Sequence, residues 1–186
     1  PAPGRIFFVS QAMQAADMDR ALSRLAHEIL ERNPDTTPAL IGIRTRGEFL
    51  ARRIAAKMAE ILLSKKQKTD VLLGVLDINL YRDDLTRVSE RPVVRETVID
   101  FSIDDTVLVL VDDVLYTGRT VRSAMNALMD YGRPKAIQLA VLIDRGHREL
   151  PIKADFVGKN IPTSDAEVVH VRMKETDADD RVTVDL

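Results

Sequence analysis

Two adjacent aspartates end an apolar run in the middle of the chain. Asp112 and Asp113 follow VLVLV at 107–111, and TGRT at 117–120 opens a predicted helix a few residues later. Backbone N–H groups at a helix start, two hydroxyl groups and a glycine that permits close approach form a cradle suited to phosphate. The carboxylates would repel that phosphate, but they can accept hydrogen bonds from sugar hydroxyls or hold Mg²⁺ through water. The segment therefore predicts a site for a ribose 5-phosphate.

Other interpretations of these motifs are weaker. The aspartates could be turn residues at a strand end and Thr117 a helix cap. The stretch Gly42–Gly47 has the glycine spacing of a Walker loop, but Glu48 stands where that loop needs lysine. An acidic pair at a strand end is also typical of phosphoacceptor receiver modules, but there it belongs near the first strand. No dinucleotide-binding, zinc-protease or serine-hydrolase motif occurs.

The elements that must position these residues alternate between apolar runs and amphipathic helices. Runs that are apolar on both faces, separated by such helices, predict an α/β fold with a mainly parallel sheet covered on both sides. Ligands of such sheets bind beyond the carboxyl ends of the strands. The predicted strands are Ala39–Ile43, Val71–Leu76, Thr106–Val111 and Ala136–Ile143. The predicted helices carry Leu22, Leu25, Ala26, Ile29 and Leu30, then Leu50, Ile54, Met58 and Ile61, then Val121, Ala124, Met125 and Leu128.

Two segments interrupt the alternation. Residues 81–97 are too charged for a core and too long for an ordinary connection, which predicts a lid. The tail from Ala154 predicts shorter strands, one at Val168–Met173, and then the acidic stretch ETDADD before a last apolar alternation.

Composition narrows the class of protein. The 186 residues fit one domain, residues 1–186, and 45% hydrophobic residues are ordinary for a globular chain. The absence of cysteine excludes disulfides and thiolate chemistry and fits a cytoplasmic location. The net charge of -2 provides no general attraction for nucleic acid, so any RNA binding needs a local basic patch. We expect no membrane span and no secretion signal.

The stretch LVLVDDVLYTGRT resembles the phosphoribosyl pyrophosphate (PRPP) signature of type I phosphoribosyltransferases. The whole chain resembles more specifically the PyrR family, pyrimidine operon attenuation regulators that are also uracil phosphoribosyltransferases. The resemblance implies their fold, a mainly parallel twisted sheet flanked by helices, with a lid at about 81–97 and a small C-terminal base-binding hood. It is carried by RLAHEIL at 24–30, GIRTRGEFLA at 42–51, LDINLYRDDL at 76–85, GRP at 132–134 and the segment 138–164.

The resemblance also implies a Mg²⁺-dependent reaction in which uracil displaces pyrophosphate from PRPP to give UMP. Asp112 and Asp113 would hold the ribose hydroxyls and Mg²⁺ and stabilise the cationic ribose, and Arg82 would act from the lid, which begins Tyr81, Arg82, Asp83 and Asp84. The implied binding residues are Thr45, Arg46 and Gly47 for pyrophosphate, Tyr116, Thr117, Gly118, Arg119 and Thr120 for the nucleotide, and Arg145 and Val157 for the base. Taken alone, residues 45–47 would be an ordinary turn entering a helix.

Tyr116 bears on substrate choice. In 6-oxopurine relatives an aspartate occupies the position before T-G, so Tyr116 favours a pyrimidine. No general base is evident. Asn79 stands where threonine is common and 99–105 replaces a proline-containing stretch, and both departures bear on how the lid closes.

The regulatory activity implied by the resemblance needs a surface for the pyr mRNA leader, with UMP as corepressor and a homodimer or homotetramer to form it. His27, Arg148, Lys153 and Lys159 are the candidate RNA-binding residues. His27 could equally be a solvated helix residue, and Arg148 and Lys159 could be ion-pair partners of Glu149 and Asp155. A phosphoribosyltransferase of another base specificity, without an RNA role, is the alternative function.

Overall fold

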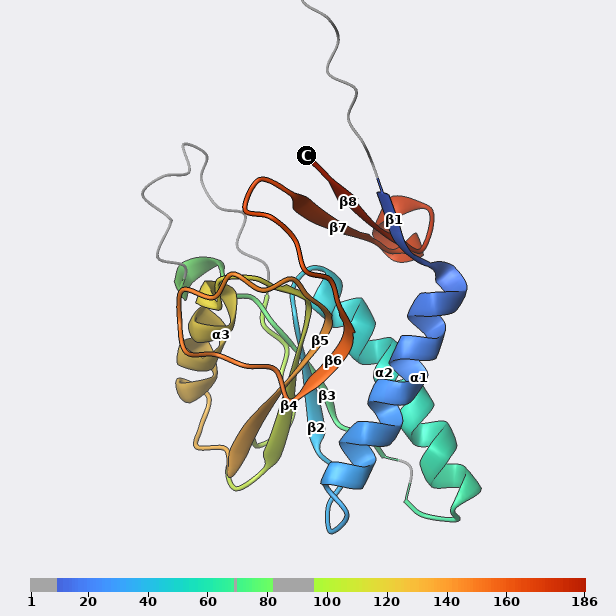
Figure 1. Cartoon of the computed structure of the whole chain (residues 1–186). Coiled ribbons are helices and arrows are strands. Elements are labelled where there is room, and N and C mark those ends of the chain that lie inside the picture. The colour runs from blue at the N-terminus through green and yellow to red at the C-terminus, as the bar shows by residue number, and fades with distance from the viewer. Residues whose placement is uncertain (1–9, 69, 82–95) are drawn as a thin grey trace, which may run out of the picture.

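The computed structural model describes residues 10–68, 70–81 and 96–186, and its centre is a five-stranded parallel sheet (Figure 1). The strand order is β3-β2-β4-β5-β6. Because β4 lies in the middle, its carboxyl end is flanked by the ends of β2 and β5. The strands are β2 (Ala39–Ile43), β3 (Leu73–Leu76), β4 (Val107–Leu115), β5 (Ala136–Asp144) and β6 (Phe156–Asn160).

Helices cover both faces of this sheet, as the apolar pattern predicts. The helices α1 (Ala15–Arg32) and α2 (Arg46–Ser64) lie on one face and α3 (Arg119–Met129) on the other (Figure 1). Alternate residues of β4 serve the two faces. Val109 and Val111 pack with α1 and α2, whereas Leu108 and Leu110 pack with α3.

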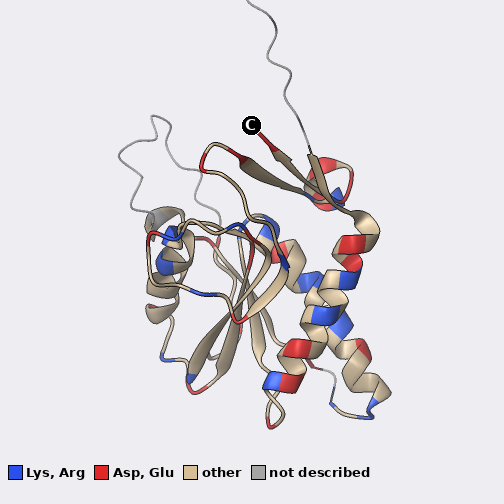
Figure 2. Cartoon of the chain, viewed as in Figure 1, with Lys and Arg blue, Asp and Glu red and all other residues tan. Residues whose placement is uncertain are grey.

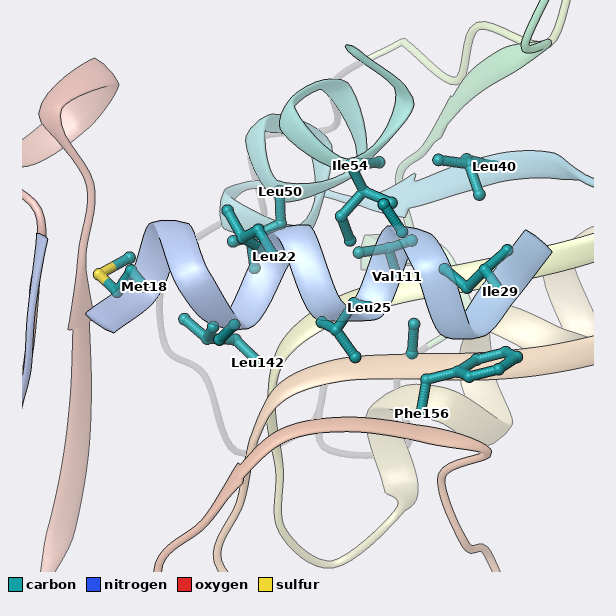
Figure 3. Packing of buried hydrophobic residues seen from close by; sticks show 14 of the residues in the cluster. Met18, Leu22, Leu25, Ile29, Leu40, Leu50, Ile54, Val111, Leu142 and Phe156 are labelled. Carbon is teal, nitrogen blue, oxygen red and sulfur yellow. The ribbon is translucent and has the colours of Figure 1, made fainter. Parts of the chain in front are cut away.

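The first helix shows how an amphipathic sequence becomes part of the core. Leu22, Leu25 and Ile29 recur at helical spacing and are buried against α2 and the sheet (Figure 3). Each such side chain contributes about 1.5–3 kcal/mol through burial. The helix begins with a capping box, in which the Gln14 N–H donates to Asp17 Oδ2 at 2.9 Å. These contacts fix α1 as a rigid support for the sheet.

A second, three-stranded antiparallel sheet forms a hood over the carboxyl ends of the strands (Figure 1). Its order is β1-β8-β7, with β1 (Ser10–Gln14), β7 (Val168–Arg172) and β8 (Arg181–Asp185). The short helix α4 (Lys174–Asp177) joins β7 to β8. The expected hood was C-terminal, but β1 supplies one of its edges, so the two ends of the described chain build it together.

Two differences in strand bounds from the sequence prediction exceed one residue. β4 continues to Leu115, so the aspartates are the sixth and seventh of its nine residues instead of following it. β3 begins at Leu73, not Val71. Of the predicted lid, residues 82–95 lie outside the described residues, and Arg82, Asp83 and Asp84 are among them. In the described part of the chain no helix is long and apolar enough to cross a membrane.

Candidate functional site

The acidic pair lies at the buried carboxyl end of the central strand. Asp112 is only 7% exposed. Its Oδ1 accepts a hydrogen bond from the Asp113 N–H at 2.9 Å, and Asp113 Oδ1 accepts one from the Val114 N–H at 2.8 Å. Main-chain donors of the same strand therefore fix both carboxylates.

Burial makes ionisation of this pair unfavourable. It raises the pKa of Asp112 well above the ordinary aspartate value, and the neighbouring charge of Asp113 raises that pKa further. Burial also raises the pKa of Asp113, although the Val114 N–H and the positive charge of Arg46 oppose that shift. A cation or a developing positive charge beside the pair would favour its ionised form. The site is therefore suited to a cationic ligand or transition state.

The predicted phosphate turn follows directly from β4. Gly118 is the N-terminal cap of α3 and adopts a left-handed conformation with φ of 92°. The Arg119 N–H donates to Thr117 Oγ1 at 3.3 Å, and Thr120 lies in the first helical turn, where N–H groups have no acceptor within the helix. The Arg119 side chain pairs with Glu149, with 2.6 Å between Nε and Oε2. Thr117, Gly118, Arg119 and Thr120 thus form one turn at a helix start.

The predicted pyrophosphate turn comes from the neighbouring strand. Thr45 caps α2, whose first residue is Arg46. A Cβ atom on Gly47 would lie 2.4 Å from the Val111 carbonyl oxygen, so only glycine lets α2 begin this close to β4. Because Gly47 lies directly against Val111, the residue before the acidic pair, its neighbour Arg46 lies beside Asp113.

A cavity of about 390 Å³ lies between the hood and the start of α2. Arg46 and Asp113 line it from the core. Asp177 and the successive β7 residues Val169, His170, Val171 and Arg172 line it from the hood. β7 is an edge strand, and its unpaired side faces this cavity. The cavity thus has a core wall and a hood wall.

Ion pairs attach the hood to α2. The Arg53 guanidinium donates to Glu175 at 2.6 and 3.0 Å and to Asp180 at 2.8 and 3.0 Å. Burial opposes the Arg53 charge, but the two carboxylates outweigh it and raise the pKa of Arg53. Figure 2 shows the acidic segment between β7 and β8, which supplies these carboxylates. The acidic composition of this segment is evident from the sequence. Its role is not, because its partner Arg53 is distant in the sequence.

The two residues predicted to hold the base are placed differently. Arg145 is 6% exposed, donates to Thr163 Oγ1 at 3.1 Å and lies 4.1 Å from the centroid of the Tyr116 ring. Tyr116 and Arg145 are therefore brought together beside the phosphate turn. Val157 lies in the edge strand β6, and its carbonyl accepts two 3.2 Å hydrogen bonds from Arg24. That carbonyl serves to hold α1 against β6.

The four predicted RNA-binding residues fall into two groups. Arg148 and Lys159 both make structural contacts. The Arg148 guanidinium pairs with Asp144 and donates to the Tyr116 carbonyl at 2.8 Å, and Lys159 Nζ donates to the Ala12 carbonyl at 2.8 Å. By contrast, the side chains of Lys153 and His27 are exposed and make no hydrogen bond or ion pair with other described residues.

The ion-pair partners considered for Arg148 and Lys159 were wrong. Glu149 pairs with Arg119, and Asp155 with Arg32 at 3.4 Å. The partner of Arg148 is Asp144, the last residue of β5, four positions earlier in the chain.

One buried acid at the base of the predicted lid was missed. Asp77 follows β3, is 8% exposed, and accepts a hydrogen bond from the Asn79 N–H at 2.9 Å. Its own N–H donates to Thr97 Oγ1 at 3.0 Å. Asp77 thereby joins the two described ends of the lid segment, Asn79–Tyr81 and the chain from Glu96. An isolated acid after a short strand gives no sequence signal for this role.

The donor set of the site fits Mg²⁺. Asp112 and Asp113 provide two hard oxygen ligands whose ionised form a divalent cation would stabilise. Among the described residues no three potential ligands gather to enclose a metal. Mg²⁺ commonly uses one or two carboxylates, with water and substrate phosphates completing its shell.

The comparisons with known proteins agree with this geometry. Residues 11–176 match the family model described as phosphoribosyl transferase domain. The chain is 58% identical over 176 residues to the "Bifunctional protein PyrR" of Thermus thermophilus, covering 94% of each. It is 56% identical over 169 residues to the "Bifunctional protein PyrR" of Elusimicrobium minutum, covering 90% of this chain and 92% of that one.

A solved structure shares the fold at low sequence identity. It is a hypoxanthine-guanine phosphoribosyltransferase of Bacillus anthracis, with a TM-score of 0.67 and 18% identity over 95% of this chain and 98% of that one. At this identity the likeness concerns the fold alone.

Proposed function

The chain belongs to the phosphoribosyl transferase domain family and, within it, to the family of bifunctional PyrR proteins; from this premise we propose that it converts uracil and PRPP to UMP and pyrophosphate and regulates pyrimidine genes by binding pyr mRNA. Both activities would reside in one fold, with the nucleotide site doubling as the UMP sensor. The relatives and the chain cover 90–94% of each other, so the premise concerns nearly the whole chain.

The observation that carries the enzymatic part is the path of the chain from β4 into α3. The buried carboxylate of Asp112 and the partly buried one of Asp113 are followed within a few residues by the turn Thr117–Thr120 at a helix start. The spacing separates groups for a sugar diol from groups for a phosphate. This arrangement fits a ribose 5-phosphate better than any other ligand class considered.

The reaction follows from these positions. The turn 117–120 would hold the 5-phosphate, and the carboxylates would accept hydrogen bonds from the ribose hydroxyls. The bond from C1 to the pyrophosphate oxygen breaks as a uracil nitrogen bonds to C1 and releases its proton to solvent, and positive charge develops on the ribose on the way. Asp112 and Asp113 would stabilise that charge. Arg46, on the cavity wall, would bind the departing pyrophosphate.

Mg²⁺ would be held by Asp112 and Asp113 together with substrate oxygens, and it would neutralise the pyrophosphate charge. The hood and the lid segment would exclude water, which would otherwise hydrolyse PRPP. We assign no general base.

Uracil specificity is supported by the pairing of Tyr116 with Arg145. The stacked ring and guanidinium occupy space beside the phosphate turn, which favours the smaller base. The deciding experiment is an assay of uracil, hypoxanthine and guanine with PRPP and Mg²⁺. We expect UMP formation to exceed formation of either purine nucleotide by about 100-fold, the order that the fit of a substrate in its pocket provides. Faster use of a purine would establish the alternative base specificity.

The regulatory part is supported by the PyrR relatives and by the exposed basic residues. We propose that Lys153 and His27 contact RNA directly, whereas Arg148 and Lys159 stabilise the surface through their contacts with main-chain carbonyls. A cytoplasmic homodimer or homotetramer would join such surfaces from several subunits.

The RNA proposal is tested by gel shift with a pyr leader hairpin. UMP should tighten binding and salt should weaken it. Lys153→Gln should weaken binding at fixed salt and reduce the salt dependence by about one ion, with uracil turnover unchanged. Lys68→Gln removes another exposed charge, which pairs with Asp70 after α2, and is the control. Equal binding by Lys153→Gln and the control would place the RNA surface elsewhere.

A further inference from the structure

One ion pair crosses the cavity from the core wall to the hood wall. Arg46 Nη2 donates to both carboxylate oxygens of Asp177, at 3.1 and 3.2 Å. Arg46 begins α2, and Asp177 ends α4, 131 residues later. Both residues line the cavity that contains Asp113. The pair therefore connects a predicted pyrophosphate-binding residue to an acidic residue to which sequence reasoning assigns no role.

Asp177 is fixed on the hood independently of Arg46. Its Oδ2 accepts hydrogen bonds from the Met173 N–H at 3.1 Å and from Thr176 Oγ1 at 2.7 Å. These bonds, together with the charge of Arg46, lower the pKa of Asp177. The hood segment itself is attached to α2 by Arg53 through Glu175 and Asp180. Asp177 is thus a charged acceptor whose position does not depend on the Arg46 side chain.

The Arg46 guanidinium keeps unused donors while Asp177 holds it. Only Nη2 binds the carboxylate, and Nε is buried without a hydrogen-bond acceptor in the described part of the chain. A buried donor without an acceptor costs free energy unless a ligand supplies the acceptor. A diphosphate in the cavity would supply several anionic oxygens. Because Asp177 immobilises a long, flexible side chain in advance, less entropy would be lost when the diphosphate binds.

We propose that Asp177 is a positioning residue that orients Arg46 toward the pyrophosphate group of PRPP. The proposal rests on the function given above. It assigns the acidic segment between β7 and β8 a part in diphosphate recognition, with Asp177 acting only through Arg46.

The first test measures the affinity of the full-length protein for inorganic pyrophosphate with Mg²⁺, together with steady-state kinetics. Asp177→Asn should raise the Kd of pyrophosphate and the KM of PRPP by about 10-fold, as loss of an orienting carboxylate does for metal ligands. The KM of uracil should not change. Asp179→Asn is the matched control, since Asp179 lies in the same segment and pairs with Arg181 at 3.1 Å, not with Arg46. If Asp177→Asn folds poorly, Thr176→Val removes one bond to Asp177, keeps its charge, and should raise the same Kd by a smaller factor.

The second test asks whether Asp177 acts through Arg46. Arg46→Gln should weaken pyrophosphate binding, and adding Asp177→Asn to it should weaken binding no further. Additive losses, unchanged or tighter binding in Asp177→Asn, or a parallel rise in the KM of uracil would each overturn the proposal. Failure of the wild-type protein to bind pyrophosphate would instead overturn the proposed function, so the two failures are distinguishable.

Discussion

The two walls of the cavity differ in how much ion pairs add to their apolar packing. The core wall, with Asp113, belongs to the end of β4, which also carries Asp112 and leads into the turn at 117–120. This strand is hydrogen-bonded on both sides and packed between two apolar clusters. The hood wall, with Asp177, belongs to a small sheet that buries Met13, Val171, Met173 and Val182 in one of these clusters. The ion pairs of Arg53 and Arg46 join it further to α2. The core wall therefore holds its charges rigidly at a cost in stability, whereas the hood combines apolar packing with stabilising charge pairs.

The largest effect should come from removing the charges of the core wall. Replacing both Asp112 and Asp113 by Asn should lower kcat/KM for UMP formation by roughly 10³-fold, since preorganised charges at a developing cation contribute on this scale. Binding of the pyr hairpin without UMP should be retained. The measurement is initial-rate kinetics with PRPP and uracil, with Asp100→Asn, an exposed aspartate, as the control. Near-normal turnover in the double variant would show that the acidic pair is not the ribose site.

The next largest effect should come from detaching the hood wall. Arg53→Met leaves Glu175 and Asp180 partly buried without their partner, and we expect about 2–3 kcal/mol less stability toward urea, below the range for fully buried pairs because these groups keep some exposure. The control is Arg52→Met on the same helix, whose side chain is 55% exposed and pairs with Glu48. It should change stability by at most about 0.5 kcal/mol. Equal losses in the two variants would mean that the Arg53 pairs do not hold the hood.

The core wall could be predicted from the sequence in detail, whereas for the hood the sequence predicted the strands of the tail but not the participation of β1 or the contacts with α2. Apolar periodicity sets which residues of β4 and α3 are buried, and the T-G turn is local, so Asp112 and Gly118 could be assigned to one unit. The pairing of β1 with β8 joins residues more than 160 positions apart and has no local pattern.

Charge pairing was the least predictable feature. Arg148 lies in a basic cluster of the sequence, which suggested an RNA contact, but its donors are used by Asp144 and by main-chain carbonyls. Asp177 lies in an acidic stretch that would be exposed in most proteins. Its contact with Arg46 depends on how the hood is placed over the sheet, and a single sequence does not encode that placement in any short motif.

The free-energy cost of burying the Asp112 carboxylate should make the stability of the protein depend on pH. The pKa of Asp112 is raised by burial, so between about pH 3.9, where an unfolded aspartate titrates, and the raised pKa of the folded state, the native protein binds more protons than the unfolded chain. Stability should therefore fall as pH rises through this window, and the full cost should remain above it.

Asp112→Asn should remove most of this dependence and leave the smaller contribution of Asp113. The variant should be more stable than the wild type by about 1–2 kcal/mol at pH 8, as when a buried charge is replaced by a neutral group of the same shape. The difference should shrink toward pH 4. Urea unfolding across this range measures it, and a gap that grows as pH falls would have the wrong sign for a carboxylate destabilised by burial.

The smallest effect tests whether the phosphate turn needs its backbone conformation. Gly118 and Gly146 both have positive φ, 92° and 83°, so alanine at either position should cost about 1 kcal/mol of stability. Only Gly118 lies at the start of α3, where the turn would face the 5-phosphate. A Cβ there would also press on Ile152 at 3.3 Å, whereas a Cβ on Gly146 meets nothing within 4 Å. Gly118→Ala should therefore raise the KM of PRPP and Gly146→Ala should not. If the two variants have equal KM values for PRPP at similar stability, the turn is not part of the binding site, while the acidic pair can still be. These two variants therefore distinguish the turn from the acidic pair, which a larger substitution in the core wall cannot do.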